Sequence, residues 1–324
     1  MPDSPDQDFR SQMAGIYPSA SPSTRANEPA SAADWLRSGT GRSPSLRWSY
    51  QTEAPLVTLR LARETGEMLI VDANGSLYVL DADGKLLAMG QGRAAVADAA
   101  WSDTGAGGIA SVDQKLIWFD RRLRIGDTKE LPRPVCGMAM EAHGHFVAVS
   151  TEDCFTSIFD ESGKSTQRFE TIQPLIFIDF FVESRGIVGA GEYDVFLCRD
   201  FTGGLLWQEK LWSNVGDLCV SGDGRAILIA AFNHGLQRYN RHGKNIGSYQ
   251  IGQTVCRVAT DYAVRRVAAA STEGDFFWLD ATGGILWQSK PPSEVKRIAC
   301  DPLATGCVVG LQSGRIERLE WGGV

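Results

Sequence analysis

The stretch FFWLDATGGILWQ, residues 276–288, has the pattern of two short strands joined by a tight turn. The apolar run FFWL ends on Asp280, and Gly283 follows three residues later. An Asp side chain can accept hydrogen bonds from the backbone N–H groups of such a turn, and glycine adopts the positive φ that the turn requires. The stretch therefore predicts a β-hairpin in which GILWQ returns antiparallel to FFWLD.

A short apolar run ending on a polar residue occurs seven times along the chain. The terminal residues are Asp81, Asp120, Asp160, Asp200, Asn240, Asp280 and Glu320. They are separated by 39 residues once and by 40 residues five times, and such a fixed period is typical of stacked or radial repeats. Glycine follows three positions after five of the first six of these residues, but Leu123 stands in this place after Asp120, so we expect a differently shaped turn there.

Each repeat holds four candidate strands, which we name A to D in chain order. An apolar residue such as Val255 begins strand A, and a run of small and β-branched residues such as VAAAS, 267–271, forms strand B. Strands C and D are the hairpin around the terminal residue. Four short antiparallel strands per repeat are the signature of a β-propeller blade. The sequence therefore predicts an all-β fold, a seven-bladed β-propeller with four antiparallel strands per blade.

The ends of the chain predict how the ring closes. Only WGGV follows Glu320, so the last repeat lacks its strand D. The segment PSLRWSYQTEAPL, 44–56, precedes the first strand A and is similar to the passages from strand D to strand A elsewhere. We therefore expect Leu46–Tyr50 to pair with the strand that ends at Glu320. The last blade is then closed by an N-terminal strand, and the join has no unpaired edge.

The first 43 residues differ in composition from the rest of the chain. They are rich in Ser, Ala, Pro and Asp and lack an apolar period of two or 3.6 residues. Such a segment buries too little apolar surface to offset its chain entropy. We predict a disordered leader, 1–43, followed by the propeller, 44–324. Two apolar islands, Ile16-Tyr17 and Trp35-Leu36, leave open the alternative of a short amphipathic turn that docks on the propeller or on a partner.

Two hairpins carry a resemblance to a known family. DFTGGLLW (200–207) and DATGGILW (280–287), and more weakly DADGKLLA (81–88), resemble the PQQ-like repeat of quinoprotein dehydrogenases and their non-catalytic relatives. The resemblance implies that a tryptophan of each blade docks on the neighbouring blade. Trp48, Trp207 and Trp287 occupy this place, whereas Ala88 and Gly247 do not. WD40-like repeats are the near alternative, although clear GH…WD pairs are absent.

The resemblance does not extend to catalysis. For a catalytic member, the resemblance to quinoprotein dehydrogenases implies an eight-bladed ring with a vicinal Cys-Cys disulfide and a calcium ion under the quinone. This chain has seven repeats and no adjacent cysteines, and no catalytic Asp or calcium ligand aligns. We expect no cofactor and no bound metal, and we lean against an enzyme. Because fold alone does not select a function, the choice has to come from the candidate sites.

Charge and composition exclude several classes of protein. The formal net charge is −7 and the isoelectric point is near 5.2, which argue against a nucleic-acid binder. The chain contains no run of about 18 apolar residues, so no membrane span is predicted. No secretory signal is readable at the start. The seven cysteines are widely spaced without a CxxC pair, as in proteins of a reducing compartment. We therefore expect a cytoplasmic protein.

The turns between strands B and C carry an excess of carboxylates. In a propeller these turns share one face with the loops between strand D and the next strand A. The candidate interaction face consists of Asp72, Asp113, Glu152, Asp153, Glu192, Asp194, Glu273 and Asp275. Solvated turns without a partner are the alternative. If the face binds, we expect a basic protein or peptide partner and an affinity that falls with salt.

The A strands carry a second set of candidates. Asp98, Asp179 and Asp217 occupy nearby positions in three blades and are expected to line the central channel. The predicted function is a non-enzymatic scaffold, a monomeric ring that binds protein through a loop face or the channel mouth. The alternative is a propeller that binds a small ligand or metal in its channel, as a lactonase-like hydrolase or a quinoprotein-like oxidoreductase.

Overall fold

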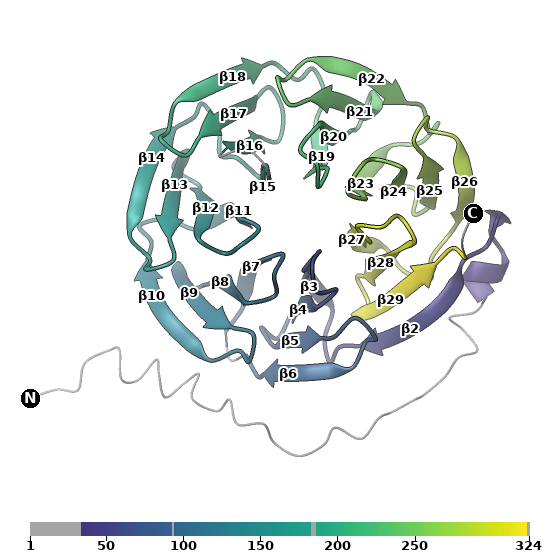
Figure 1. Cartoon of the computed structure of the whole chain (residues 1–324), viewed down its shortest axis with the longest axis horizontal. Helices are drawn as coiled ribbons and strands as arrows, with labels where there is room; N and C mark the ends of the chain where they lie inside the picture. Colours follow the sequence, from purple (N-terminus) through teal and green to yellow (C-terminus); the bar gives the residue numbers. More distant parts are fainter. Residues whose placement is uncertain (1–33, 93, 183–185, 323–324) are drawn as a thin grey trace, which may run out of the picture.

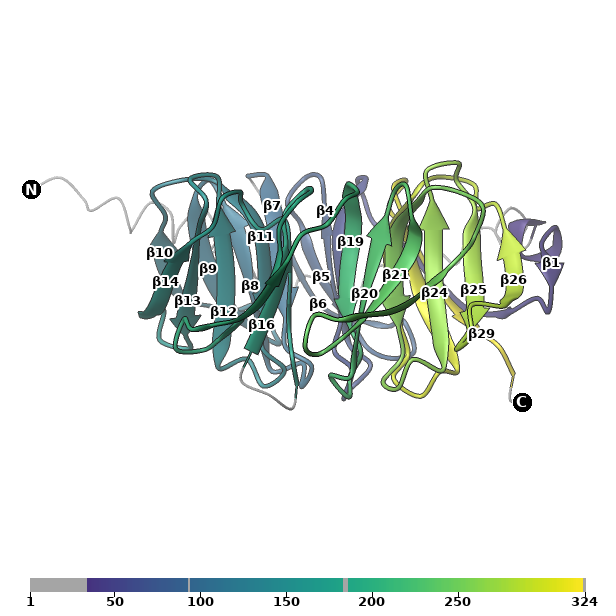
Figure 2. The ribbon, with the colours of Figure 1, turned by 90° about the horizontal axis from the view of Figure 1, so that it is seen from above.

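The computed structural model describes residues 34–92, 94–182 and 186–322. It is a ring of seven sheets arranged radially around a central axis (Figure 1). In every sheet strand A lies innermost and strand D is the outermost of the four blade strands, and consecutive strands are antiparallel. The prediction of an all-β, seven-bladed propeller is confirmed. Seen from the side, the ring is a disc whose blades stand side by side (Figure 2).

Blades 1 to 4 follow one another along the chain. Their strands are β3 (Leu56–Leu61), β4 (Met68–Asp72), β5 (Leu77–Leu80) and β6 (Leu86–Gly90); β7 (Val96–Trp101), β8 (Gly107–Val112), β9 (Lys115–Asp120) and β10 (Ile125–Glu130); β11 (Val135–Met140), β12 (Phe146–Thr151), β13 (Phe155–Asp160) and β14 (Ser165–Glu170); β15 (Phe177–Phe180), β16 (Gly186–Ala190), β17 (Phe196–Asp200) and β18 (Leu205–Glu209).

Blades 5 to 7 complete the ring and include the N-terminal strands. Their strands are β19 (Val215–Val220), β20 (Ala226–Ala231), β21 (Gly235–Asn240) and β22 (Asn245–Tyr249); β23 (Val255–Thr260), β24 (Arg266–Ser271), β25 (Phe276–Asp280) and β26 (Ile285–Ser289), with β1 (Thr40–Gly41) at the edge; β27 (Val295–Cys300), β28 (Gly306–Leu311), β29 (Arg315–Glu320) and β2 (Ser45–Gln51).

The seventh blade closes with a strand from the other end of the chain. β2 pairs antiparallel with β29, with Leu46 opposite Leu319 and Tyr50 opposite Ile316. The predicted pairing of Leu46–Tyr50 with the strand ending at Glu320 is therefore confirmed. Because β2 supplies the missing strand D, the ring is joined by backbone hydrogen bonds between the first and last repeats.

The hairpin turns follow the predicted chemistry, with one correction. Asp280 Oδ1 accepts hydrogen bonds from the backbone N–H groups of Thr282 (2.8 Å) and Gly284 (3.0 Å). In blade 2, Asp120 Oδ1 accepts from Arg122 (2.8 Å) and Arg124 (2.9 Å) in the same positions.

The expectation of a different turn after Asp120 is therefore wrong. Leu123 adopts φ 59°, in the left-handed region that glycine occupies in the other turns. This conformation costs a non-glycine residue about 1–2 kcal/mol. The side chain of Leu123 is buried in the core between blades 1 and 2, with an exposed fraction of 2%, and this burial offsets the strain.

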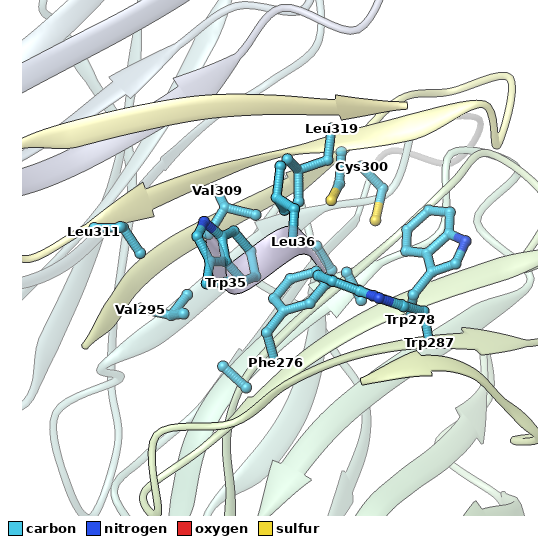
Figure 3. Packing of buried hydrophobic residues seen from close by; sticks show 14 residues of the cluster. Trp35, Leu36, Phe276, Trp278, Trp287, Val295, Cys300, Val309, Leu311 and Leu319 are labelled. Atoms are coloured by element: carbon cyan, nitrogen blue, oxygen red, sulfur yellow. The ribbon is translucent and has the colours of Figure 1, made fainter. Parts of the chain in front are cut away.

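The predicted boundary of the disordered leader at residue 43 is also wrong. Residues 34–37 form one turn of helix, and β1 pairs with β26. Trp35 and Leu36 are buried in the core between blades 6 and 7 (Figure 3), where apolar side chains of both blades surround them. The docked-turn alternative for Trp35-Leu36 thus holds, whereas Ile16-Tyr17 lies outside the described residues. We call residues 34–41 the N-terminal latch.

Candidate functional site

The predicted interaction face contains one residue that does not belong to a binding surface. The carboxylate of Asp72 is fully buried. One oxygen accepts hydrogen bonds from the backbone N–H groups of Asn74 and Ser76, both at 3.0 Å. The other accepts from the Tyr78 hydroxyl at 2.8 Å. Asp72 therefore builds its own turn, and it is removed from the candidate face.

Three further carboxylates are half-buried and have partners within the protein. Asp194 forms an ion pair with Lys210 at 3.0 Å. Asp275 accepts a hydrogen bond from Gln253 Nε2 at 2.9 Å. Asp153 accepts from the Thr151 hydroxyl at 2.6 Å, and this bond lowers the pKa of Asp153. These side chains hold neighbouring loops together, so they contribute charge to the face more than direct contact area.

The remaining predicted residues of the face are exposed: Asp113, Glu152, Glu192 and Glu273. The loops between strands D and A add two exposed carboxylates, Glu53 and Glu294, that the sequence analysis had not included. Their signal was present, because both lie within three residues of the start of a strand A. We call these six residues the acidic face.

Few cations balance this face. Lys115 forms an ion pair with Glu130 at 3.2 Å, and Arg315 forms one with the buried Glu317 at 2.6 Å. Arg133 and Lys290 are exposed in the loops between strands D and A. Within the described part of the chain, exposed carboxylates therefore outnumber exposed cations on these turns and loops. The surface is therefore negatively charged, and this charge attracts a basic partner.

The three channel candidates are found on the inner strands but serve as connections between blades. Asp179 accepts a hydrogen bond from the backbone N–H of Val220 in blade 5 at 2.9 Å. Asp217 accepts one from Val258 in blade 6 at 3.1 Å. Burial raises the pKa of both carboxyl groups. The hydrogen bonds and the nearby arginines have the opposite, smaller effect. Each carboxylate thus ties its blade to the next one.

The third channel candidate is paired with an arginine. The Arg60 guanidinium lies 3.2 Å from Asp98 Oδ2 and donates from Nε to the carbonyl of Ala99 at 2.9 Å. This contact joins blades 1 and 2. In the described residues, no group of three or more His, Cys, Asp or Glu side chains gathers in the manner of a metal site. Asp98, Asp179 and Asp217 therefore do not form one cluster.

Two arginines that the sequence analysis overlooked continue this pattern. Arg257 donates from Nε to the carbonyl of Lys296 in blade 7 at 3.0 Å and from Nη1 to that of Gly216 in blade 5 at 3.1 Å. Arg297 donates to the Thr58 hydroxyl in blade 1 at 3.3 Å. Both stand at whole repeats after Asp217, which is the signal that identifies them. The inner wall is a series of polar contacts between blades.

Two of the three predicted docking tryptophans donate a hydrogen bond to the next blade. Trp48 Nε1 donates to the carbonyl of Ala82 at 2.9 Å, and Trp207 Nε1 donates to that of Arg241 at 2.8 Å. Blade 5 has Gly247 at the expected place, but the Tyr249 hydroxyl donates to the carbonyl of Ala281 at 2.8 Å instead. A tyrosine two residues later therefore makes the same contact, which the search for tryptophan overlooked.

Trp287 has a different environment. It is fully buried, and its Nε1 has no hydrogen-bond partner. Its ring centroid lies 5.4 Å from that of Trp35 and 5.7 Å from that of Trp321. The N-terminal latch therefore covers the tryptophan that other blades present to their neighbours.

The geometry defines a seven-bladed β-propeller. It is similar to the β-propeller domain of Cps50 (Swd1) from Myceliophteria thermophila, with a TM-score of 0.72 and 13% identity, covering 86% of this chain and 99% of that domain. At this identity the likeness shows the fold. No family model matches the chain, and a comparison with curated protein sequences finds no match. None of the helices described is long and apolar enough to cross a membrane.

Proposed function

We propose that the protein is a non-enzymatic, cytoplasmic scaffold that binds a basic segment of another protein on its acidic face. The observation that supports this proposal is the set of exposed carboxylates Asp113, Glu152, Glu192 and Glu273 in the B–C turns of blades 2, 3, 4 and 6. A rigid ring holds these turns at fixed spacing, so little ordering entropy is lost when a partner binds. The ring acts as a monomer and, given the sign of the face, does not bind nucleic acid.

The neighbouring fold is consistent with this proposal, since the Cps50 domain is a propeller of the WD40 type. The finer assignment to PQQ-like repeats is also a proposal. It is supported by the contact of Trp48 and Trp207 with the following blade. The alternative function required Asp98, Asp179 and Asp217 to bind a ligand in the channel. These carboxylates have partners within the protein instead, because Asp179 and Asp217 accept backbone hydrogen bonds and Asp98 is paired with Arg60.

The experiment compares two triple variants against a library of Lys- and Arg-rich peptides. The test variant carries Glu152→Lys, Glu192→Lys and Glu273→Lys. The control variant carries the same charge change away from the acidic face, at the exposed Glu64, Asp127 and Glu161.

We expect the test variant to lose at least tenfold in affinity for peptides that bind the native protein, and the control to lose less than threefold. Affinity of the native protein falls as salt rises. Equal losses in both variants, or binding insensitive to salt, would remove the acidic face from the account.

A further inference from the structure

A pocket of about 270 Å³ lies between blades 4 and 5. Leu211, Val215, Ala231 and Tyr239 supply much of its apolar lining, and Gln237 adds an amide. Trp212 also lines it, with an exposed fraction of 79%. An exposed tryptophan beside an apolar pocket is the kind of surface that protein partners use.

The repeat relates this pocket to the groove that Trp35 occupies between blades 6 and 7, which we call the Trp35 seat. Val215 pairs with Ala231 across strands A and B, as Val295 pairs with Leu311. Four lining residues match residues of the Trp35 seat that come two repeats later in the chain. The matches are Val215 to Val295, Ala231 to Leu311, Gln237 to Glu317 and Tyr239 to Leu319.

The seat shows how such a groove holds its occupant. Trp35 Nε1 donates to Glu317 Oε2 at 3.0 Å, and the Trp35 ring packs against Phe276 and Trp287. The Ser289 hydroxyl donates to the Trp35 carbonyl. Five residues further on, β1 adds to the outer edge of β26. An inserted indole (Figure 3) and a short added strand (Figure 2) are therefore the two parts of the contact.

Both parts have a counterpart at blades 4 and 5. Gln237 Oε1 accepts a hydrogen bond from Asn245 Nδ2 at 2.8 Å and keeps a second acceptor position for an indole N–H. β18 corresponds to β26, and no strand of the described chain adds to its outer edge. Leu205 and Leu206 on β18 are 49% and 58% exposed.

The charge of blade 5 indicates which partner fits. Residues 224–260 contain no Asp or Glu. The cations of strands B to D and their turns are Arg225, Arg238, Arg241 and Lys244, accompanied by His234 and His242. Arg241 and Lys244 are exposed. Arg225 pairs with Asp223, whereas Arg241 and Lys244 give the C–D turn of blade 5 the opposite sign to the acidic face, so this turn complements an acidic segment.

We propose that the groove between blades 4 and 5 binds an extended acidic segment of a partner protein, which inserts a tryptophan beside Gln237 and adds a strand to β18. The segment binds as residues 34–41 bind between blades 6 and 7. The groove adjoins the acidic face, because the Val215 N–H donates to the carbonyl of Glu192 at 2.8 Å, but neither proposal depends on the other.

The probe is a fluorescent peptide with the sequence of residues 34–41, carrying Arg37→Glu and two additional N-terminal Glu residues. A second peptide also carries Trp35→Ala. Binding to the full-length protein is measured by fluorescence anisotropy at low and high salt. We expect saturable binding of the first peptide, at least tenfold weaker binding of the second, and a loss of affinity as salt rises.

Protein variants locate the binding. Trp212→Ala and Lys244→Glu change exposed side chains at the groove and on blade 5 and are each expected to weaken binding at least fivefold. Lys164 occupies the same turn position in blade 3 and is equally exposed, so Lys164→Glu is the matched control and is expected to change binding less than twofold. The proposal is overturned if the tryptophan peptide does not bind, if Lys164→Glu weakens binding as much as Lys244→Glu, or if neither groove variant has an effect.

Discussion

The junction between blades 6 and 7 and the junction between blades 4 and 5 are built from the same positions of the repeat, yet one is filled and the other is open. At the first, Trp35 of the N-terminal latch occupies the groove and donates to Glu317. At the second, a pocket remains beside Gln237. The comparison teaches that a repeat supplies equivalent grooves, and that side chains from outside the repeat decide which of them stay available.

The largest effect is expected from emptying the filled junction. Trp35→Ala removes a side chain that is only 4% exposed and leaves the Glu317 carboxylate without its indole donor. We expect a loss of about 3–5 kcal/mol in the free energy of unfolding, the usual cost of truncating a buried tryptophan. Urea unfolding followed by circular dichroism measures it.

Trp212→Ala is the control for this change, because its side chain is 79% exposed. Its free energy of unfolding should stay within about 0.5 kcal/mol of the native value. If the two alanine variants were equally stable, the latch would not be part of the folded ring.

The contact between Trp207 and the turn of blade 5 holds the open junction together. Gly243 lies under this ring with φ 77°, and a Cβ atom there would come within 2.7 Å of Trp207 Cε3. Gly252 has nearly the same φ, 75°, but open space around it. Gly252→Ala is expected to cost about 1 kcal/mol from backbone strain alone. Gly243→Ala should cost about 2–4 kcal/mol, since overpacking adds to the strain.

Thermal and urea unfolding of the two variants test this difference. Because the two glycines have nearly the same φ, the excess loss in Gly243→Ala reports the packing of Trp207 on the neighbouring blade. Equal losses of unfolding free energy in the two variants would show that the Trp207 ring can move aside without destabilising the protein.

The smallest effect expected is a pH dependence of the filled junction. Burial raises the pKa of Glu317, against Arg315 and the Trp35 hydrogen bond, which lower it. A folded-state pKa above the unfolded value means that the folded state binds the proton more tightly. The stability from this group is then complete below the unfolded pKa and is lost as pH rises through the folded pKa.

Glu317→Gln removes this titration. Between pH 4 and pH 7, the native protein should therefore lose more unfolding free energy, or gain less, than the variant does. Parallel pH curves for the two proteins, or a steeper loss in the variant, would contradict the raised pKa.

The sequence predicted the blades because each one repeats local chemistry. Asp280 and its equivalents fix the turn through backbone hydrogen bonds two and four residues away. The closing strand was also predictable, because Leu46–Tyr50 has the pattern of a strand D without a preceding strand C. Features that depend on neighbours a few residues away are visible in the sequence.

The features that were mispredicted depend on distant contacts. Trp35 stands in a segment with no periodic pattern, and its seat is formed by residues more than 220 positions later. Asp179 has the composition of a ligand, but the N–H that satisfies it belongs to Val220 of the next blade. Leu123 tolerates a glycine conformation because blade 1 buries it. A single sequence does not show these contacts, because they arise only when blades meet.

The pairing of β2 with β29 has a consequence for how the protein is made. β2 leaves the ribosome before blades 1 to 6, whereas its partner β29 follows more than 260 residues later in the chain. Closure therefore awaits the synthesis of β29, and such distant pairings form slowly. During that interval β2 has an unsatisfied edge that other chains can join. The yield of folded protein should thus depend on chaperones and on growth temperature more steeply than its final stability suggests.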